Sequence, residues 1–277
     1  MNDPQLLQAV FEGIESTLIE VGDRKHRTKP MRDALREAAA EAVRFHTDED
    51  YFRAMVAVVF YSGMRAAAVS DRIDTIRKHF PSYSVVAKYG EEEILAILAD
   101  PEMLKNERKI RACVHNAKKF VEIVNKPGLF AQYLGETHDV EVLRKKLMKN
   151  FKFLGKITSF HYLMDIGYNL VKPDRVVSRI FSRLRLVEGL PNPDNPDPSK
   201  LTDEQLWQIV RMGQTIAESV NQPIRYVDLV FVAYGQVEGS DPDGLPQGVC
   251  LDANPRCWLC GVRPHCRYEP KTVTALA

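Results

Sequence analysis

The sequence lacks any long hydrophobic run and any excess of charge of one sign. No stretch approaches the roughly 20 consecutive apolar residues of a membrane helix. The first residues, MNDPQ, show no basic segment followed by an apolar core, so we expect no secretory signal and a cytoplasmic protein with no membrane partner. The 38 Lys and Arg residues balance the 37 Asp and Glu residues. The net charge of +1 therefore does not indicate a nucleic-acid partner, and only the local placement of charges could do so.

Strand signals are also absent, because no segment alternates convincingly between apolar and polar residues, and no repeat of 20–50 residues is present. Helical spacing is common instead, with apolar residues three or four positions apart at Leu7, Val10, Phe11, Ile14 and Leu18, and again at Ile110, Cys113, Ala117, Phe120 and Ile123. Capping boxes are expected at Thr47 and Thr202. Residues 189–200 (GLPNPDNPDPSK) hold four prolines and must form a loop. The sequence therefore predicts an all-α fold.

Cysteine is scarce, and four of the five residues fall together as Cys250, Cys257, Cys260 and Cys266. Their pattern is C-x6-C-x2-C-x5-C. Zinc sites usually combine two short C-x2-4-C pairs with a longer spacer. The short and unequal spacings here favour a loop folded around a [4Fe–4S] cluster, which is held by four thiolates. Zinc and unligated thiols remain the alternatives, and Cys113 is expected to be a small buried side chain.

The cysteine spacing resembles the iron–sulfur loop of the endonuclease III-like DNA glycosylases, which belong to the helix-hairpin-helix superfamily. In that family the cluster is structural and shapes a loop that presents basic side chains to DNA. Arg256, Arg263, His265 and Arg267 stand in the corresponding positions here, and the resemblance implies a phosphate contact for Arg263. Trp258, inside the loop, is expected to pack over the cluster.

The resemblance also implies a helix-hairpin-helix upstream, and residues 151–159 (FKFLGKITS) fit it. Gly155 permits a tight turn, Thr158 begins the next helix, and Lys152 and Lys156 add positive charge. Backbone N–H groups at such a turn can hold a DNA phosphate without reading sequence. The simpler interpretation is an ordinary corner between two helices.

An aspartate follows at the position that the superfamily uses for its catalytic carboxylate. Asp174 lies 19 residues after Gly155, at the start of a helix that also carries Arg175 and Arg179, which we expect to contact DNA. Cleavage of an N-glycosidic bond builds oxocarbenium-like charge on the sugar, which a fixed anion stabilises. The alternative role of Asp174 is to cap its helix, and both roles are compatible.

Other segments resemble 3-methyladenine glycosylase I, namely residues 103–110, residues 116–120, and residues 151–155 with Tyr162, Met164 and Gly167. Bifunctional superfamily members carry a Schiff-base lysine where Ile157 stands, which favours a monofunctional hydrolase. The chain also departs from the family, because Val58 occupies the position of a pocket glutamate. Met64, in the turn Ser62-Gly63-Met64, is a candidate wedge for the DNA stack, or else a core methionine.

Tyr61, His161 and Asp165 are the candidates for the base pocket, because aromatic and acidic side chains suit a cationic alkylated base. We expect a two-domain protein with a six-helix domain over residues 27–168 and a cluster domain formed by residues 1–26 and 169–277. The expected function is a monomeric, nucleoid-associated DNA glycosylase of base excision repair, acting on damaged double-stranded DNA, with an alkylated purine as first substrate. The alternatives are a glycosylase for a modified or mismatched pyrimidine, with or without lyase activity, and a non-catalytic module that binds DNA lesions.

Overall fold

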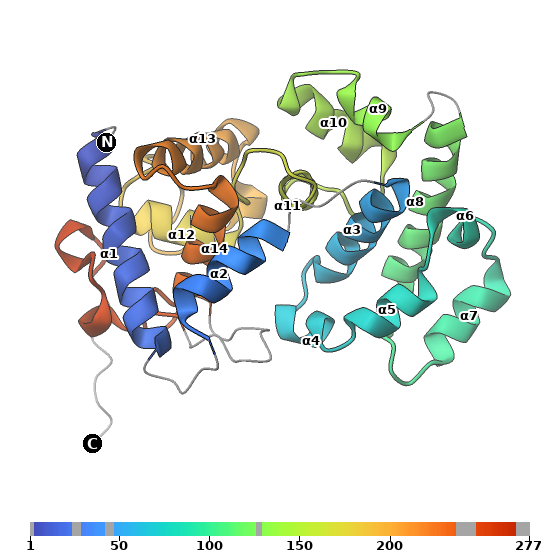
Figure 1. The fold of residues 1–277 in the computed structure, drawn as a ribbon, viewed down its shortest axis with the longest axis horizontal. Helices are drawn as coiled ribbons and strands as arrows, with labels where there is room; N and C mark the ends of the chain where they lie inside the picture. The colour runs from blue at the N-terminus through green and yellow to red at the C-terminus, as the bar shows by residue number, and fades with distance from the viewer. Residues whose placement is uncertain (1–2, 24–28, 42–46, 126–128, 237–247, 270–277) are drawn as a thin grey trace. The chain divides into compact units, whose positions relative to one another are not determined.

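The computed structural model describes residues 3–23, 29–41, 47–125, 129–236 and 248–269, and every regular element in these ranges is a helix (Figure 1). The predicted all-α fold is confirmed for this part of the chain. The chain divides into two compact units, which are residues 42–168 (the central unit) and residues 1–41 with 169–277 (the split unit). Within the described ranges, no helix has both the length and the apolar character that a membrane crossing requires.

The central unit is built from consecutive helices joined by short turns. They are α3 (Asp48–Tyr61), α4 (Ala66–Ser70), α5 (Ile73–His79), α6 (Tyr83–Val86), α7 (Glu91–Ala99), α8 (Glu107–Asn125), α9 (Phe130–Gly135), α10 (Val140–Asn150) and α11 (Thr158–Asp165). The capping box predicted at Thr47 is present, with Thr47 and Asp50 each accepting from the other's backbone N–H. α8 packs its apolar face into the core, where Phe120 stacks on Phe130 with ring centroids 4.0 Å apart.

The split unit joins the two ends of the described chain. It contains α1 (Pro4–Asp23), α2 (Met31–Glu41), α12 (Arg175–Arg183), η1 (Pro198–Lys200), α13 (Asp203–Ser219), α14 (Ile224–Gly235), η2 (Cys257–Leu259) and η3 (Arg263–His265). The apolar helix α14 lies at its centre and contacts α1, α2, α12 and α13. The proline-rich residues 189–200 form a loop that ends in η1, as predicted.

The first boundary between the units was expected after residue 26, but the structure places it after residue 41. α2, which the sequence suggested for the first domain, packs on α14 and α1 and belongs to the split unit. Met31 and Leu35 are buried there. Which helices cover the buried face of α2 depends on tertiary packing, which spacing along the chain does not show.

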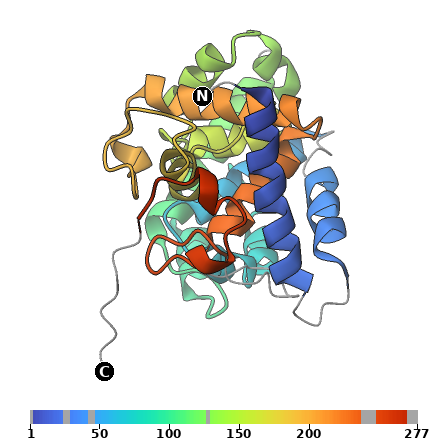
Figure 2. The ribbon, with the colours of Figure 1, turned by 90° about the vertical axis from the view of Figure 1, so that its left-hand side faces the viewer.

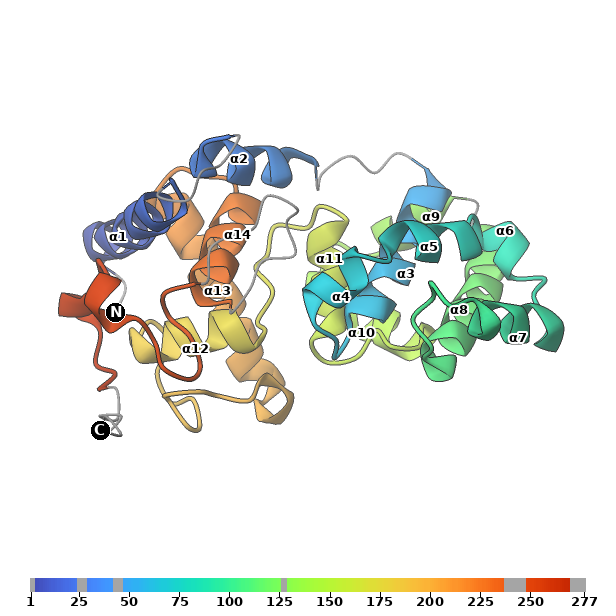
Figure 3. The ribbon, with the colours of Figure 1, turned by 90° about the horizontal axis from the view of Figure 1, so that it is seen from below.

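Residues 248–269, the cysteine loop, lie beside α1 and α12 (Figures 2 and 3). The N–H of Gly261 donates to Thr17 Oγ1 at 3.0 Å. Val262 is buried so close to Gly13 that a Cβ on Gly13 would come within 2.8 Å of Val262 Cγ1. Glycine at position 13 therefore lets the loop dock against the middle of α1.

Candidate functional site

The predicted helix-hairpin-helix is present as α10, a turn over residues 151–157, and α11. Thr158 Oγ1 closes the turn, since it accepts from the N–H of Gly155 at 2.7 Å and donates to the carbonyl of Phe153 at 2.5 Å. The side chain of Asn116 holds the backbone of Lys152 through both its N–H and its carbonyl, at 2.8 and 3.0 Å. These contacts fix the turn while Lys152 and Gly155 stay exposed.

The sequence suggested that Gly155 takes the tight position of the turn. In the structure this position is taken by Phe153. Phe153 has φ +62°, in the left-handed region, whereas Gly155 is not among the residues with positive φ. A Cβ on Gly155 would meet only Thr158 Oγ1, at 3.8 Å, which is an ordinary contact. Neither the backbone nor internal packing requires glycine here, so its missing side chain leaves room on the outer surface of the turn.

Replacing Gly155 by Ala should therefore separate DNA binding from stability. We expect unchanged stability or a gain of about 0.4–1 kcal/mol, because alanine restricts the unfolded chain. The predicted phosphate contact of the turn implies weaker binding to duplex DNA, because the methyl group would occupy the space that a phosphate needs. Thermal unfolding and fluorescence anisotropy with a labelled duplex measure the two effects. Gly135→Ala in α9, where a Cβ would meet nothing within 4 Å, is the matched control, and equal DNA affinity of the two variants contradicts the prediction.

Arg144 supports the same turn from inside the central unit. The sequence alone did not indicate this role. Its fully buried guanidinium donates to Ser159 Oγ at 3.0 Å and to the carbonyl of Lys156 at 2.8 Å. It also lies over the ring of Phe160, at 4.2 Å from the centroid. An arginine on an amphipathic helix is usually exposed, so only the position of α11 identifies this one as structural.

Asp174 is the N-cap residue of α12. Its Oδ1 accepts from the N–H groups of Val176 and Val177 at 2.9 and 3.1 Å. Its Oδ2 lies 3.1 Å from Lys172 Nζ, and the side chain is 22% exposed. The capping role that the sequence left open is thus present, and it holds the carboxylate in one orientation while part of it stays accessible.

A second carboxylate, that of Asp228, contacts the backbone just before Asp174. Asp228 of α14 is 2% exposed, accepts from the N–H of Lys172 at 2.9 Å, and lies 3.5 Å from Arg225 Nη1. Burial raises the pKa of Asp228, and the positive charges of Arg225 and Lys172 oppose that rise. Asp228 therefore anchors the backbone just before Asp174. The contact joins residues that are far apart in the sequence, so no local signal could have revealed it.

The arginines of α12 have different surroundings from those expected. Arg175 is exposed, as predicted for a DNA contact. Arg179 is only 4% exposed and donates to the backbone carbonyls of Gly235 and Cys250, at 2.6 and 3.1 Å from Nη2. The prediction that Arg179 contacts DNA is therefore wrong, because its guanidinium is used to hold the start of the cysteine loop. Burial lowers the pKa of Arg179 from its ordinary value.

Arg183, one turn further along α12, holds the next residues of the loop. The sequence alone did not indicate this role. It is 3% exposed and donates to the carbonyls of Asp194, Leu251 and Asp252 at 2.7, 2.6 and 3.3 Å. Its Nη1 lies 3.5 Å from Cys250 Sγ, and its guanidinium lies 4.0 Å from the ring centroid of Tyr268. Two buried cations of α12 thus face the beginning of the cysteine loop.

The four clustered cysteines form no disulfide bonds and are partly buried. Cys260 Sγ accepts from the hydroxyl of Tyr234 at 3.1 Å, and Cys266 Sγ lies 3.7 Å from the carbonyl of Arg183. In the described residues, no group of three or more His, Cys, Asp or Glu side chains is arranged to hold a metal ion.

The outer side of the cysteine loop is basic and aromatic. His265 and Arg267 are exposed, while Arg263 is partly exposed and donates from Nη1 to the carbonyl of Tyr268 at 2.5 Å. Trp258 is 78% exposed, and its packing over a cluster stays a prediction. The one-turn helix η2 presents its indole to solvent.

The three candidates for the base pocket lie together in the central unit, at the contact of α3 with α11. The rings of Tyr61 and His161 are 6.2 Å apart between centroids. His161 Nε2 lies 3.2 Å from Asp165 Oδ2, and the hydroxyl of Tyr61 pairs with Ser70 Oγ at 2.9 Å. All three side chains are half-buried. Their role in base recognition stays a prediction.

The turn that carries Met64 follows α3 directly. Gly63 has φ +66°, which favours glycine, and Met64 is partly exposed, so it is not a core methionine. Lys109 of α8 is 3% exposed and donates to the carbonyls of Phe60 and Ser62 at 2.6 and 2.7 Å. Burial lowers the pKa of Lys109, and the two carbonyls stabilise its ammonium. Lys109 therefore caps α3 and fixes the turn.

Replacing Lys109 by Met should destabilise the central unit by about 2–3 kcal/mol, because two carbonyls lose a charged donor. The predicted insertion of Met64 into DNA implies, in addition, that activity on damaged duplex should fall more than the folded fraction alone explains. Urea unfolding measures the first effect, and turnover at a temperature where both proteins are folded measures the second. Arg108→Met, an exposed neighbour on α8, is the control. A Lys109→Met protein as stable as this control contradicts the prediction.

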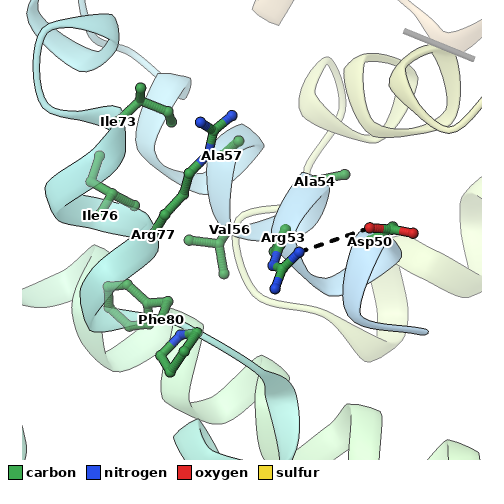
Figure 4. A pocket seen from close by; sticks show the side chains of 10 residues that line it. Asp50, Arg53, Ala54, Val56, Ala57, Ile73, Ile76, Arg77 and Phe80 are labelled. Atoms are coloured by element: carbon green, nitrogen blue, oxygen red, sulfur yellow. Dashed lines mark ion pairs between the residues drawn. The ribbon is translucent and has the colours of Figure 1, made fainter. Parts of the chain in front are cut away.

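A groove of about 630 Å³ lies between α3 and α5 (Figure 4). Its lining is mainly apolar, but Arg53 and Arg77 also line it. Arg53 Nη1 lies 4.0 Å from Asp50 Oδ1. The lining residues are Asp50, Arg53, Ala54, Val56, Ala57, Ile73, Ile76, Arg77, Phe80 and Pro81. None of the predicted base-pocket residues is among them, so this groove is separate from the group of Tyr61, His161 and Asp165.

The helical fold of the described residues is similar to the folds of solved DNA glycosylases. The structure is similar to that of a Methanocaldococcus jannaschii 8-oxoguanine glycosylase/lyase in complex with DNA containing 8-oxoguanine. The two chains are 17% identical, with a TM-score of 0.54 over 78% of this chain and 95% of that one. A Thermotoga maritima 8-oxoguanine DNA glycosylase is 16% identical, with a TM-score of 0.52 over 80% of this chain and 95% of that one.

The sequence itself matches the methyladenine glycosylase family model over residues 41–150. The predicted relationship to the DNA glycosylases is thereby confirmed. The matched residues contain Tyr61, Met64 and Lys109. The hairpin turn, Asp174 and the four clustered cysteines follow the matched region, so their roles depend on the geometry described above.

Proposed function

We propose that this protein is a DNA N-glycosylase of base excision repair, which hydrolyses the N-glycosidic bond of a damaged base turned out of the duplex. The observation that carries the proposal is the geometry of Asp174. One carboxylate oxygen is held by two amides of α12, and the other oxygen faces Lys172 at a partly exposed position.

The chemistry requires a fixed negative charge beside the sugar. As the base leaves, positive charge develops on the deoxyribose, and a carboxylate that need not reorient stabilises it most effectively. The same carboxylate can orient the attacking water and accept its proton. Lys172 Nζ lies 3.1 Å from this carboxylate, and Asp228 holds the backbone of Lys172 in place.

The hairpin supplies a grip on DNA that does not depend on sequence. The first N–H groups of an α-helix have no acceptor within the helix, and those of α11 begin beside the exposed Gly155 and Lys152. Arg175, Arg263 and the partly exposed Lys156 add positive charge for further phosphates. Such contacts make binding fall steeply with salt concentration.

An alkylated purine is the first substrate class to test. The match of residues 41–150 to the methyladenine glycosylase family supports this choice. So does the group of Tyr61, His161 and Asp165, because an electron-rich ring and a carboxylate favour a base that carries positive charge. A hydrolytic reaction without lyase activity is supported by Ile157, a residue without an amine at the start of α11.

The test is to incubate the full-length protein with duplexes that carry alkylated, oxidised, deaminated or mismatched bases, and to identify released bases by mass spectrometry. We expect a free alkylated purine and an abasic strand that breaks only after alkali. Strand cleavage without alkali would contradict the monofunctional assignment. Binding to damaged duplex with no base released from any substrate would instead support a non-catalytic lesion-binding module. Size-exclusion chromatography of the protein with and without DNA tests the expected monomer.

We also propose that Cys250, Cys257, Cys260 and Cys266 hold a [4Fe–4S] cluster. The four cysteines of this loop form no disulfides and supply the number of thiolates that such a cluster needs, although in the described residues they are not gathered around one metal position. The surroundings fit as well, because a cluster with four thiolates is anionic, and the buried guanidinium groups of Arg179 and Arg183 lie at the start of the loop. The cluster would supply no step of the reaction and would brace the loop that carries Arg263.

The protein purified without oxygen should be yellow-brown and should contain about four iron and four sulfide per chain. Cys257→Ser should lose most of this iron together with the visible absorbance, whereas Cys113→Ser, at a buried site in α8, should retain both. Metal analysis and absorption spectra distinguish the outcomes. A colourless protein with one zinc per chain would contradict the cluster.

A further inference from the structure

Trp258 is the most unusual exposed side chain in the described residues. Tryptophan is highly buried on average, yet this one is 78% exposed, more than any other large hydrophobic residue described. The other tryptophan, Trp207 of α13, is partly buried. An isolated exposed leucine needs no explanation, but an exposed indole costs more hydrophobic free energy and is typical of binding surfaces.

The segment around Trp258 is firmly supported. Arg179 and Arg183 hold the carbonyls of Cys250 and Leu251 at the start of the loop. Gly261, three residues after Trp258, donates to Thr17 of α1, and the neighbouring Val262 is buried. The indole is therefore held on a fixed base, which lowers the entropy that binding would cost.

Basic residues flank Trp258 in the sequence of the loop. Arg256 and Arg263 are partly exposed, and His265 and Arg267 are exposed. Acidic side chains in the described part of the loop are limited to Asp252 and Glu269, near its two ends. An aromatic side chain among cations is complementary to nucleic acid, which offers phosphates to the cations and flat base or sugar faces to the ring.

We propose that Trp258 contacts double-stranded DNA, with its indole against a sugar or base next to the phosphates that Arg263 and Arg267 bind. The inference rests on the proposed function in so far as that function makes duplex DNA the partner. It adds an apolar contact to a loop for which the sequence indicated only charges. An apolar contact contributes affinity that does not depend on salt, whereas each phosphate contact adds to the salt dependence.

The first experiment measures duplex affinity at several salt concentrations for the wild type and for Trp258→Ala. We expect the variant to bind about 5- to 100-fold more weakly, the range of aromatic contacts to nucleic acid. The slope of log K against log salt should stay unchanged. Arg267→Ala should instead reduce that slope by about one. Trp258→Phe should restore most of the affinity, and Leu95→Ala, at an exposed leucine of the central unit, is the control with wild-type binding.

The second experiment measures protection of the indole itself. Hydroxyl-radical oxidation followed by mass spectrometry should show less oxidation of Trp258 when duplex saturates the protein, with Trp207 as the internal reference. Equal affinity of wild type and Trp258→Ala, or unprotected Trp258 in the complex, overturns the proposal. Protection by single-stranded DNA alone, or by a partner protein and not by duplex, also overturns it. If the wild type binds no duplex, the proposed function fails as well, whereas duplex binding without base release leaves the Trp258 contact standing.

Discussion

Asp174→Asn should reduce the rate of base release by about 10²–10⁴-fold while leaving the fold intact. Asparagine caps helices as well as aspartate does, so its side-chain oxygen can keep the two hydrogen bonds to Val176 and Val177. The substitution removes the negative charge and its ion pair with Lys172, but little else. Single-turnover release of the base, measured with enzyme in excess, isolates the chemical step from product release.

A matched control for this variant exists in the central unit. Asp139 is the N-cap of α10, and its Oδ1 accepts from Glu141 and Val142 in the same way. Asp139→Asn should keep both stability and activity. Asp174→Ala should lose activity and, in addition, about 1 kcal/mol of stability with the cap. Base release by Asp174→Asn at the wild-type rate would show that Asp174 is only a cap and would remove the carboxylate from the mechanism.

Arg183→Met should have the largest effect on stability, a loss on the order of 3–4 kcal/mol from the split unit. Methionine fills much of the space of the arginine side chain but donates no hydrogen bond. The carbonyls of Asp194, Leu251 and Asp252 would therefore lose their donor inside the protein. Because two of these carbonyls begin the cysteine loop, the loop should detach at the same time.

Urea unfolding followed by circular dichroism measures the loss, and limited proteolysis within residues 248–269 reports on the loop. Arg175→Met, at an exposed position of the same helix, is the control and should change stability by less than about 0.5 kcal/mol. Arg183→Lys should be intermediate, because one ammonium cannot reach three carbonyls in the fork geometry of arginine. A stable Arg183→Met protein with a protease-resistant loop contradicts the bracing role.

Local patterns predicted much of the molecule correctly. The apolar spacing of residues 110–123 matches the buried face of α8, and the capping boxes at Thr47 and Thr202 begin α3 and α13. These features depend on residues within one or two helical turns, and such interactions are readable from sequence. The hairpin after α10 and the capping aspartate of α12 belong to the same group.

The main difference from the sequence-based expectations concerns exposure. Arg179 was expected to contact DNA, yet its side chain is only 4% exposed. Burial depends on which distant segment covers a side chain, and residue type gives only an average. The carbonyls that draw Arg179 inward belong to Gly235 and Cys250, 56 and 71 residues away.

The sequence by itself determined the helices, the helix-hairpin-helix, the position of Asp174 and the grouping of the four cysteines, because each depends on spacing along the chain. Only the tertiary structure decided the surroundings of these residues. Three buried polar side chains pair with groups that are distant in the sequence. Asp228 pairs with the backbone of Lys172, Arg183 with the cysteine loop, and Lys109 with the turn before Met64. A buried polar group must be paired, but many partners satisfy it equally well, so its choice follows from how the helices pack.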